Sequence, residues 1–151
     1  MDMRELHLLA HDIRSRENVG SLFRTADSLG IAKLWLTGYT PVPPDDKISK
    51  VALGAEQAVP FEAVKDVAAV IKRLNAEKVP VFALELTPGA VDLAAFAAPD
   101  RLALLLGTEV AGIPPSLVAL CDGAVKITQR GIKESMNVAV AAGIAAWKIL
   151  S

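Results

Sequence analysis

The sequence has little material for covalent cross-linking or membrane insertion. It contains one cysteine in 151 residues, so Cys121 has no partner for an internal disulfide, and we expect it to be a small core residue. No apolar run is long enough to span a bilayer, and the N-terminal segment mixes charges into its first residues where a signal peptide has an apolar core. These absences predict a cytoplasmic protein without a membrane partner.

Neither sign of charge is in excess. The formal net charge is −1, which gives no global indication of a nucleic-acid partner, although a local basic patch remains compatible with it. Hydrophobic residues make up 52% of the chain, enough for one well-filled core at this length. We therefore expect a single domain over residues 1–151.

Familiar catalytic and nucleotide-binding motifs are missing. No G-x-G-x-x-G follows an apolar run, and GTEVAGIP (107–114) has Ile113 and Pro114 where a phosphate-binding loop needs Lys and Ser or Thr. A G-x-S-x-G hydrolase turn is absent. His7 and His11 have no Cys or Glu at a metal-ligand spacing. We expect no metal and a structural role for both histidines.

Short apolar runs alternate with segments of helical periodicity. Runs rich in Val, Leu and Ile that alternate with helices predict an α/β fold, with a mostly parallel sheet covered by helices on both faces. The predicted strands are 6–11, 33–37, 79–86, 101–106 and 123–127, with a less regular candidate at 59–64; the predicted helices are 18–29, 64–77, 114–121 and 135–149, with a short one at 47–55.

Four polar loops follow predicted strands. Their sequences are DIRSRENVG (12–20), TPG (87–89), TEVAGIPP (108–115) and TQRGIKESMN (128–137). In a parallel sheet, ligands bind outside the carboxyl ends of the strands. The loops therefore predict a binding site at one edge of the sheet.

The segment RENVGSLFRTADSLG (16–30) has an unusual opening for a helix. Asn18 is placed as an N-cap and Gly30 as a C-cap. Gly20 in the first turn destabilises a helix by up to about 1 kcal/mol relative to alanine, and Arg24 lies one turn later on the same side. This side is either a solvated helix face or exposed backbone with a cation, which would hold a phosphate or a developing alkoxide.

The last predicted helix, within SMNVAVAAGIAAWKIL (135–150), is apolar on almost every side. Such a helix has to be covered on every side. The sheet covers one side, and a second subunit is the simplest cover for the other, with Ala141, Ala142 and Gly143 permitting close packing. A central helix in a monomer is the alternative. The N-terminal end of this predicted helix is polar, with Ser135 and Asn137, and is suited to binding an electron-rich ligand.

Three stretches together resemble a known family. NVGSLFRTADSLG, LLLGTEVAGIP and ITQRGIKESMNVAVA, in this order, are similar to motifs 1, 2 and 3 of the SpoU (TrmH-like) RNA ribose 2′-O-methyltransferases of the SPOUT superfamily. The resemblance implies a SPOUT-type fold with a C-terminal trefoil knot, a homodimer, S-adenosyl-L-methionine as cofactor, and tRNA or rRNA as substrate. Thr128 and Gln129, where Pro-Met is common, and Met136, often Leu, depart from the pattern.

Carried over residue by residue, the resemblance assigns roles in the site. It implies Arg24 as the central catalytic residue, with Asn18, Glu109 and Asn137 completing the catalytic set. Five further residues would surround the cofactor, mainly through backbone groups: Leu84, Gly107, Ile127, Ser135 and Met136.

Local charge favours an RNA partner. Five basic residues fall in the loops of the predicted binding edge: Arg14, Arg16, Arg24, Arg130 and Lys133. Two more, Lys47 and Lys50, would extend this basic patch. The alternatives are a base methyltransferase of the same superfamily, a non-catalytic RNA-binding protein on this fold, and a flavodoxin-like small-ligand domain.

Overall fold

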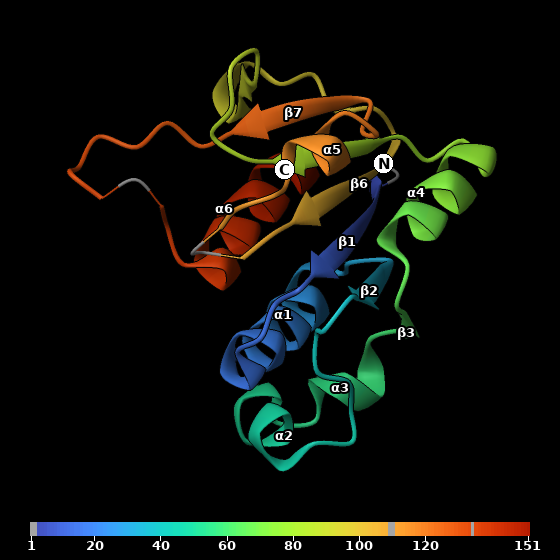
Figure 1. Ribbon diagram of the computed structural model, residues 1–151. Helices are drawn as coiled ribbons and strands as arrows, with labels where there is room; N and C mark the ends of the chain where they lie inside the picture. Colours follow the sequence, from blue (N-terminus) through green and yellow to red (C-terminus); the bar gives the residue numbers. More distant parts are fainter. Residues whose placement is uncertain (1–2, 109–110, 134) are drawn as a thin grey trace.

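The computed structural model describes residues 3–108, 111–133 and 135–151 (Figure 1). Glu109, which the resemblance makes catalytic, lies outside these residues. In chain order the elements are β1 (Glu5–His11), α1 (Arg16–Leu29), β2 (Lys33–Thr37), α2 (Asp46–Ala52), α3 (Ala55–Ala58), β3 (Phe61–Val64), α4 (Val67–Ala76), β4 (Val81–Leu84), β5 (Val91–Asp92), the 3-10 turn η1 (Leu93–Ala95), β6 (Arg101–Leu106), α5 (Pro115–Val118), β7 (Gly123–Lys126) and α6 (Val138–Leu150).

The strands form one parallel sheet, as predicted. Within the described residues it has seven strands in the order β3-β2-β1-β6-β4-β7-β5. Leu8 of β1 is in register with Leu34 of β2 and Leu104 of β6. The less regular candidate at 59–64 is confirmed as the edge strand β3. The two-residue strand β5 at the other edge was not predicted, because it is too short to show a pattern.

Helices cover both faces of the sheet, which confirms the predicted layers (Figure 1). Leu8, Leu34 and Leu104 belong to a core that includes the buried sides of α1, α2 and α6. Leu9 and Leu105, one residue along their strands, belong to a second core under α4. Successive side chains on a strand face opposite ways, so both faces need apolar residues. Among the described helices, none combines the length and hydropathy that a membrane crossing needs.

The opening of α1 differs from the prediction. The helix begins at Arg16, and Ser15 is its N-cap, with the hydroxyl accepting a hydrogen bond from the Asn18 amide at 3.1 Å. Asn18 is therefore a residue of the first turn and not the cap. Gly30 ends the helix with φ 70°, as predicted.

Gly20 has a packing role, and its interpretation as exposed backbone is wrong. The residue is buried, and a Cβ there would lie 2.7 Å from the Ile48 carbonyl oxygen and 2.8 Å from Cβ of Val51. Both neighbours belong to α2. Only glycine allows α2 to approach α1 this closely, so Gly20 is explained without a ligand.

The last helix leaves one side uncovered in the single chain. Val140, Ile144 and Trp147 are 53%, 41% and 63% exposed, whereas Ala142 is 0% exposed and packs in the core. Ala142 therefore cannot contact a second subunit, and the exposed side lies elsewhere on the helix. The chain reaches α6 from β7, beyond β4 in the sheet, and returns to pack on α1. A trefoil knot is compatible with this route, but the knot itself stays a prediction.

Candidate active site

A large cavity opens at the carboxyl ends of β4, β6 and β7. We call it the main cavity. Its volume is about 910 Å³, and its lining comes from residues 84–87, 106–108, 111–113, 126–129 and 135–136, with Pro115, Val118, Lys133, Val138 and Ala141. Three of the four polar loops that follow predicted strands therefore meet at one edge of the sheet, as expected for a parallel α/β fold.

The five residues predicted to surround a cofactor all line the main cavity: Leu84, Gly107, Ile127, Ser135 and Met136. They come from the end of β4, the start of the loop after β6 and the loop after β7, which are far apart in the sequence. The structure thus brings the predicted set together, while their contact with a cofactor stays a prediction.

Gly107 lies at a tightly packed part of the cavity wall. A Cβ there would lie 2.6 Å from Cγ1 of Ile113 and 3.0 Å from the carbonyl group of Gly112. The following turn closes on itself, because the Gly112 amide donates to the Thr108 carbonyl oxygen at 2.9 Å. The backbone at Gly107 is therefore held close to its neighbours, and no larger side chain fits without movement.

Glu85 is a residue of the main cavity that sequence reasoning missed. Its Oε2 accepts a hydrogen bond from the Ile113 amide at 2.6 Å, and its Oε1 accepts one from the Leu86 amide at 3.1 Å. The carboxylate therefore ties the loop after β4 to the loop after β6. Its position directly after a buried strand was the available signal.

The loop after β7 is also tied down. The Thr128 hydroxyl, which lines the main cavity, donates a hydrogen bond to Asp92. This bond, with the Ala94 amide and the nearby cations Lys126 and Arg130, holds the pKa of Asp92 below its ordinary value. Asp92 is therefore ionised at neutral pH and remains an acceptor for Thr128.

Asn18 and Asn137 meet between α1 and α6. Asn137 Nδ2 donates a hydrogen bond to Asn18 Oδ1 at 3.2 Å, while Asn137 Oδ1 accepts from the amides of Ala139 and Val140 as the N-cap of α6. Both asparagines line a groove of about 650 Å³ along the two helices. We call it the α1–α6 groove; its other lining residues are Ser21, Thr25, Ala139, Val140, Gly143, Ile144 and Trp147.

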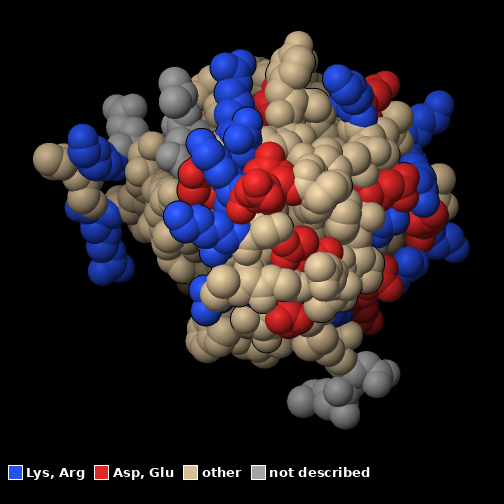
Figure 2. Space-filling model, turned by 90° about the horizontal axis from the view of Figure 1, so that it is seen from below, with Lys and Arg blue, Asp and Glu red and all other residues tan. Residues whose placement is uncertain are grey.

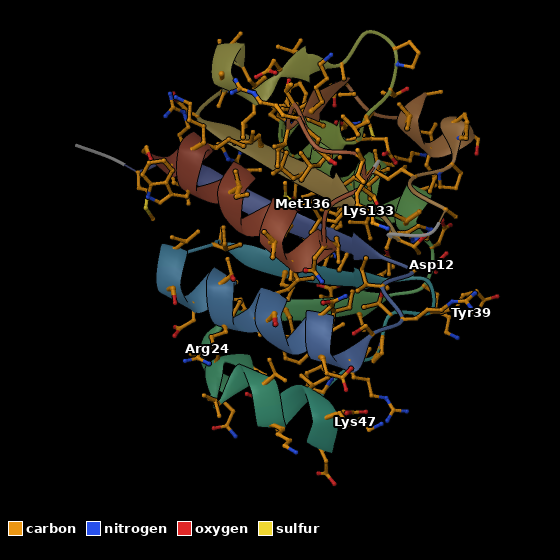
Figure 3. The ribbon with its side chains drawn as sticks, turned by 90° about the vertical axis from the view of Figure 1, so that its left-hand side faces the viewer. Asp12, Arg24, Tyr39, Lys47, Lys133 and Met136 are labelled. Carbon is orange, nitrogen blue, oxygen red and sulfur yellow. The ribbon has the colours of Figure 1, made fainter. Side chains whose placement is uncertain are left out.

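Arg24 is not brought to this pair. Its side chain is exposed, and it lines neither the main cavity nor the α1–α6 groove. In Figure 3 it lies well apart from Met136 and Lys133. Arg24 follows Ser21 by three residues, and residues at this spacing are neighbours on a helix surface. Gly20, four residues before Arg24, packs on α2, so Arg24 lies at the edge of the α1–α6 groove, between this groove and α2.

Both histidines have structural partners, in keeping with their predicted role. Trp35 Nε1 donates to His7 Nδ1 at 3.2 Å, and His7 Nε2 lies 2.8 Å from Glu5 Oε2. His11 Nδ1 lies 3.0 Å from the Thr37 hydroxyl. Among the described residues, no group of three or more His, Cys, Asp or Glu side chains could hold a metal ion.

The predicted basic patch is mixed with acidic residues. Arg16 Nε lies 3.4 Å from Asp45 Oδ2, and Lys47 and Lys50 are exposed on α2. Figure 2, seen from the α2 side, shows Lys and Arg side chains gathered beside a group of acidic ones. Lys133 instead lines the main cavity. Cationic character is therefore local and broken by carboxylates.

Cys121 is only partly buried and lies three residues beyond the end of α5. Its thiol donates to the Leu117 carbonyl oxygen at 3.4 Å. Burial, with a smaller contribution from Asp122, raises the pKa of Cys121 to about 11. The thiol is therefore protonated at neutral pH and a poor nucleophile.

Known proteins resemble the chain over nearly its whole length. A mouse protein, tRNA (guanosine(18)-2′-O)-methyltransferase TARBP1, is 32% identical over 145 residues, which are 95% of this chain and 9% of its own length. The 23S rRNA (guanosine-2′-O-)-methyltransferase RlmB of Neisseria meningitidis is 32% identical over 146 residues, 92% of this chain. The chain spans about half (55%) of that bacterial relative.

The comparison of structures and the family model indicate the same family. The crystal structure of the SpoU methyltransferase AviRb from Streptomyces viridochromogenes, in complex with AdoMet, is 26% identical and superposes with a TM-score of 0.89, over 99% of this chain and 58% of its own. The model of the SpoU rRNA Methylase family matches residues 5–147. The chain therefore belongs to the SpoU rRNA methylase family.

Proposed function

We propose that this chain is an S-adenosyl-L-methionine-dependent RNA methyltransferase that modifies a ribose 2′-hydroxyl of tRNA or rRNA. The main cavity carries the proposal, because the five predicted cofactor residues all line it. Both relatives described above are named as guanosine 2′-O-methyltransferases, one for tRNA and one for rRNA. Guanosine is accordingly the first nucleoside to test.

The residues of the main cavity fit the cofactor. The volume of about 910 Å³ lies within the range of small-molecule sites. Apolar side chains such as Leu84 and Ile127 line the cavity beside exposed backbone at Gly107, while Glu85 and Lys133 supply opposite charges. When bound, S-adenosyl-L-methionine supplies a methyl group on a positively charged sulfur, which is already an activated leaving group.

The protein has to align the acceptor oxygen and stabilise its charge. A ribose hydroxyl is a poor nucleophile, and correct alignment can remove roughly 7–11 kcal/mol of barrier. Asn18 and Asn137 present amide groups for the ribose or its phosphate, and Glu109 orients the site. Arg24 stabilises the negative charge that develops on the oxygen. A guanidinium does not act as a base in proteins, so the proton leaves to an RNA phosphate or to water.

This role for Arg24 requires a homodimer. Arg24 lies outside the main cavity of its own chain and flanks the α1–α6 groove. The groove presents Val140, Ile144 and Trp147 to solvent, and exposed apolar patches of this kind mark protein interfaces. We infer that a second copy covers the groove and that each Arg24 then serves the main cavity of the partner subunit.

Two measurements test this function. The first is calorimetric titration with S-adenosyl-L-methionine. The second is the transfer of labelled methyl groups to a tRNA fraction and, in a different reaction, to an rRNA fraction. Nuclease digestion of the product followed by mass spectrometry distinguishes a methylated ribose from a methylated base. We expect saturable cofactor binding and a 2′-O-methylnucleoside in one fraction. A base-methylated product would favour the base methyltransferase, and no cofactor binding at millimolar concentration would contradict the proposal.

A further inference from the structure

A second pocket lies beside the main cavity. We call it the loop pocket. It has a volume of about 490 Å³ and is built mainly by the β1–α1 loop, including His11, Asp12 and Arg14. Thr108 and Gly112, on the loop after β6, line both the loop pocket and the main cavity. A molecule in the loop pocket would therefore lie one loop away from a cofactor in the main cavity.

The polar wall of the loop pocket is held in a fixed position. Asp12 has φ 54°, an uncommon conformation for a residue other than glycine. Its Oδ1 accepts a hydrogen bond from the Tyr39 amide at 2.8 Å, and its Oδ2 lies 3.4 Å from His11 Nε2. Gly38 has φ 62°, and a Cβ there would overlap the Asp12 carboxylate. The loops after β1 and β2 are thus joined through one side chain.

This junction also places an aromatic ring at the same edge of the sheet. Tyr39 is 73% exposed, the largest exposed fraction of any aromatic side chain among the described residues. Figure 3 shows Asp12 and Tyr39 at one end of the molecule, with the tyrosine pointing outward. Its backbone is fixed by Asp12, while the ring is left uncovered. Neither sheet packing nor helix packing explains an aromatic side chain in this position.

We propose that the loop pocket and Tyr39 bind an unpaired nucleotide of the RNA substrate. The pocket supplies a cation at Arg14 for phosphate, and the Asp12 carboxylate, which His11 holds in place, for donor groups on a base edge. The Tyr39 ring supplies a flat surface on which a base stacks. An unpaired nucleotide is required because a duplex hides the faces of its bases. The inference rests on the proposed function, since the shared loop places this nucleotide beside the methyl donor.

Fluorescence anisotropy tests whether the loop pocket and Tyr39 form a subsite for RNA. It compares a short unpaired RNA of mixed sequence with a blunt duplex of the same composition. S-adenosylhomocysteine is kept at saturation, so that RNA cannot occupy the main cavity. We expect the wild-type protein to prefer the unpaired RNA. Tyr39→Ala should weaken its binding about tenfold, while Tyr39→Phe, the matched control that keeps the ring, should bind as the wild type does.

Arg14 gives a second, independent readout. Arg14→Ala should weaken binding and lower the slope of log affinity against log salt by about 1, because one phosphate contact is lost. The control is Lys72→Ala, which removes an exposed cation on α4, away from the loop pocket. It should leave the slope unchanged.

The outcomes separate the subsite from the proposed function. Equal affinity for unpaired and duplex RNA, or Tyr39→Ala and Arg14→Ala variants that both bind like the wild type, would overturn the subsite even if methyl transfer is intact. If the wild-type protein does not bind S-adenosyl-L-methionine, the proposed function itself is overturned.

Discussion

The main cavity and the α1–α6 groove differ in how much of each is built by one chain. The main cavity has its predicted lining residues in place, and its loops are fixed to one another through Glu85 and through Thr128 on Asp92. The groove holds the Asn18–Asn137 pair but exposes Ile144 and Trp147, with Arg24 at its flank. Cofactor binding should therefore be a property of the single chain, and methyl transfer a property of the assembly.

Arg24→Ala should produce the largest effect that separates the two regions. Removal of a group that stabilises developing negative charge lowers the rate constant by about 100- to 1,000-fold. Cofactor affinity should remain at the wild-type value, because Arg24 does not line the main cavity. Single-turnover transfer at saturating RNA and calorimetry measure the two quantities. Arg24→Lys keeps the charge but loses the planar fork, so little activity should return. A normal transfer rate in Arg24→Ala would refute the assignment.

Ile144→Glu should separate the subunits. A carboxylate placed in an apolar contact has no partner there, and we expect the dissociation constant of the dimer to rise about 100-fold. Light scattering over a dilution series measures it. Val91→Glu is the matched control, because Val91 is 46% exposed but lies on β5 outside the groove. If both variants and the wild-type protein have the same mass at every dilution, the groove is not the interface.

Gly107→Val should act on the main cavity alone. Overpacking against Ile113 and Gly112 should weaken cofactor affinity by about 10- to 100-fold, and the subunits should remain associated. Calorimetry measures the affinity, and thermal unfolding verifies the fold. Gly131→Ala is the control in the loop after β7, because a Cβ there meets no atom within 4 Å. Equal affinities for the two variants would contradict the tight wall described at Gly107.

Gly20→Ala should have the smallest effect, on stability alone. Alanine favours a helix by about 1 kcal/mol, but its Cβ would clash with α2, so we expect a net loss of about 1–2 kcal/mol in the free energy of unfolding. Denaturant titration measures it, with Ser28→Ala as a control on the exposed side of the same helix. A stabilised variant with weakened RNA binding would restore the interpretation of Gly20 as exposed backbone.

Much of the fold could be predicted from the sequence, because both sheet faces are buried and the strands are apolar runs. Leu8 and Leu9 are neighbours on β1 and pack in different cores. Both faces of the strand are therefore apolar, and the strand appears in the sequence as a continuous apolar run. Boundaries were harder to predict. Ser15 replaced Asn18 as the cap of α1, since both residue types cap helices. The helix predicted at 47–55 ends at Ala52, and α3 begins only at Ala55, because Leu53 and Gly54 between them both have positive φ.

The residues of the candidate site could be predicted where a loop follows a strand. They could not be predicted where the position depends on contacts between segments far apart in the sequence. Leu84, Gly107 and Ile127 each stand at or just beyond the end of a strand, and all face the main cavity. The contact of Gly20 with α2 depends on how two helices approach, which no local pattern encodes. The Asp12–Tyr39 contact likewise joins loops after two neighbouring strands.

Mixing of Arg24→Ala with Gly107→Val, at a cofactor concentration that loads the wild-type main cavity but not that of Gly107→Val, tests most directly whether each Arg24 serves the partner subunit. Arg24→Ala keeps the main cavity, and Gly107→Val keeps the arginine. In a two-fold symmetric dimer, a mixed pair has one complete site, so an equimolar mixture after subunit exchange should recover about a quarter of the wild-type transfer rate. Recovery should be lost when both variants also carry Ile144→Glu. A mixture as inactive as its separate components, despite exchange seen by native mass spectrometry, would contradict the account.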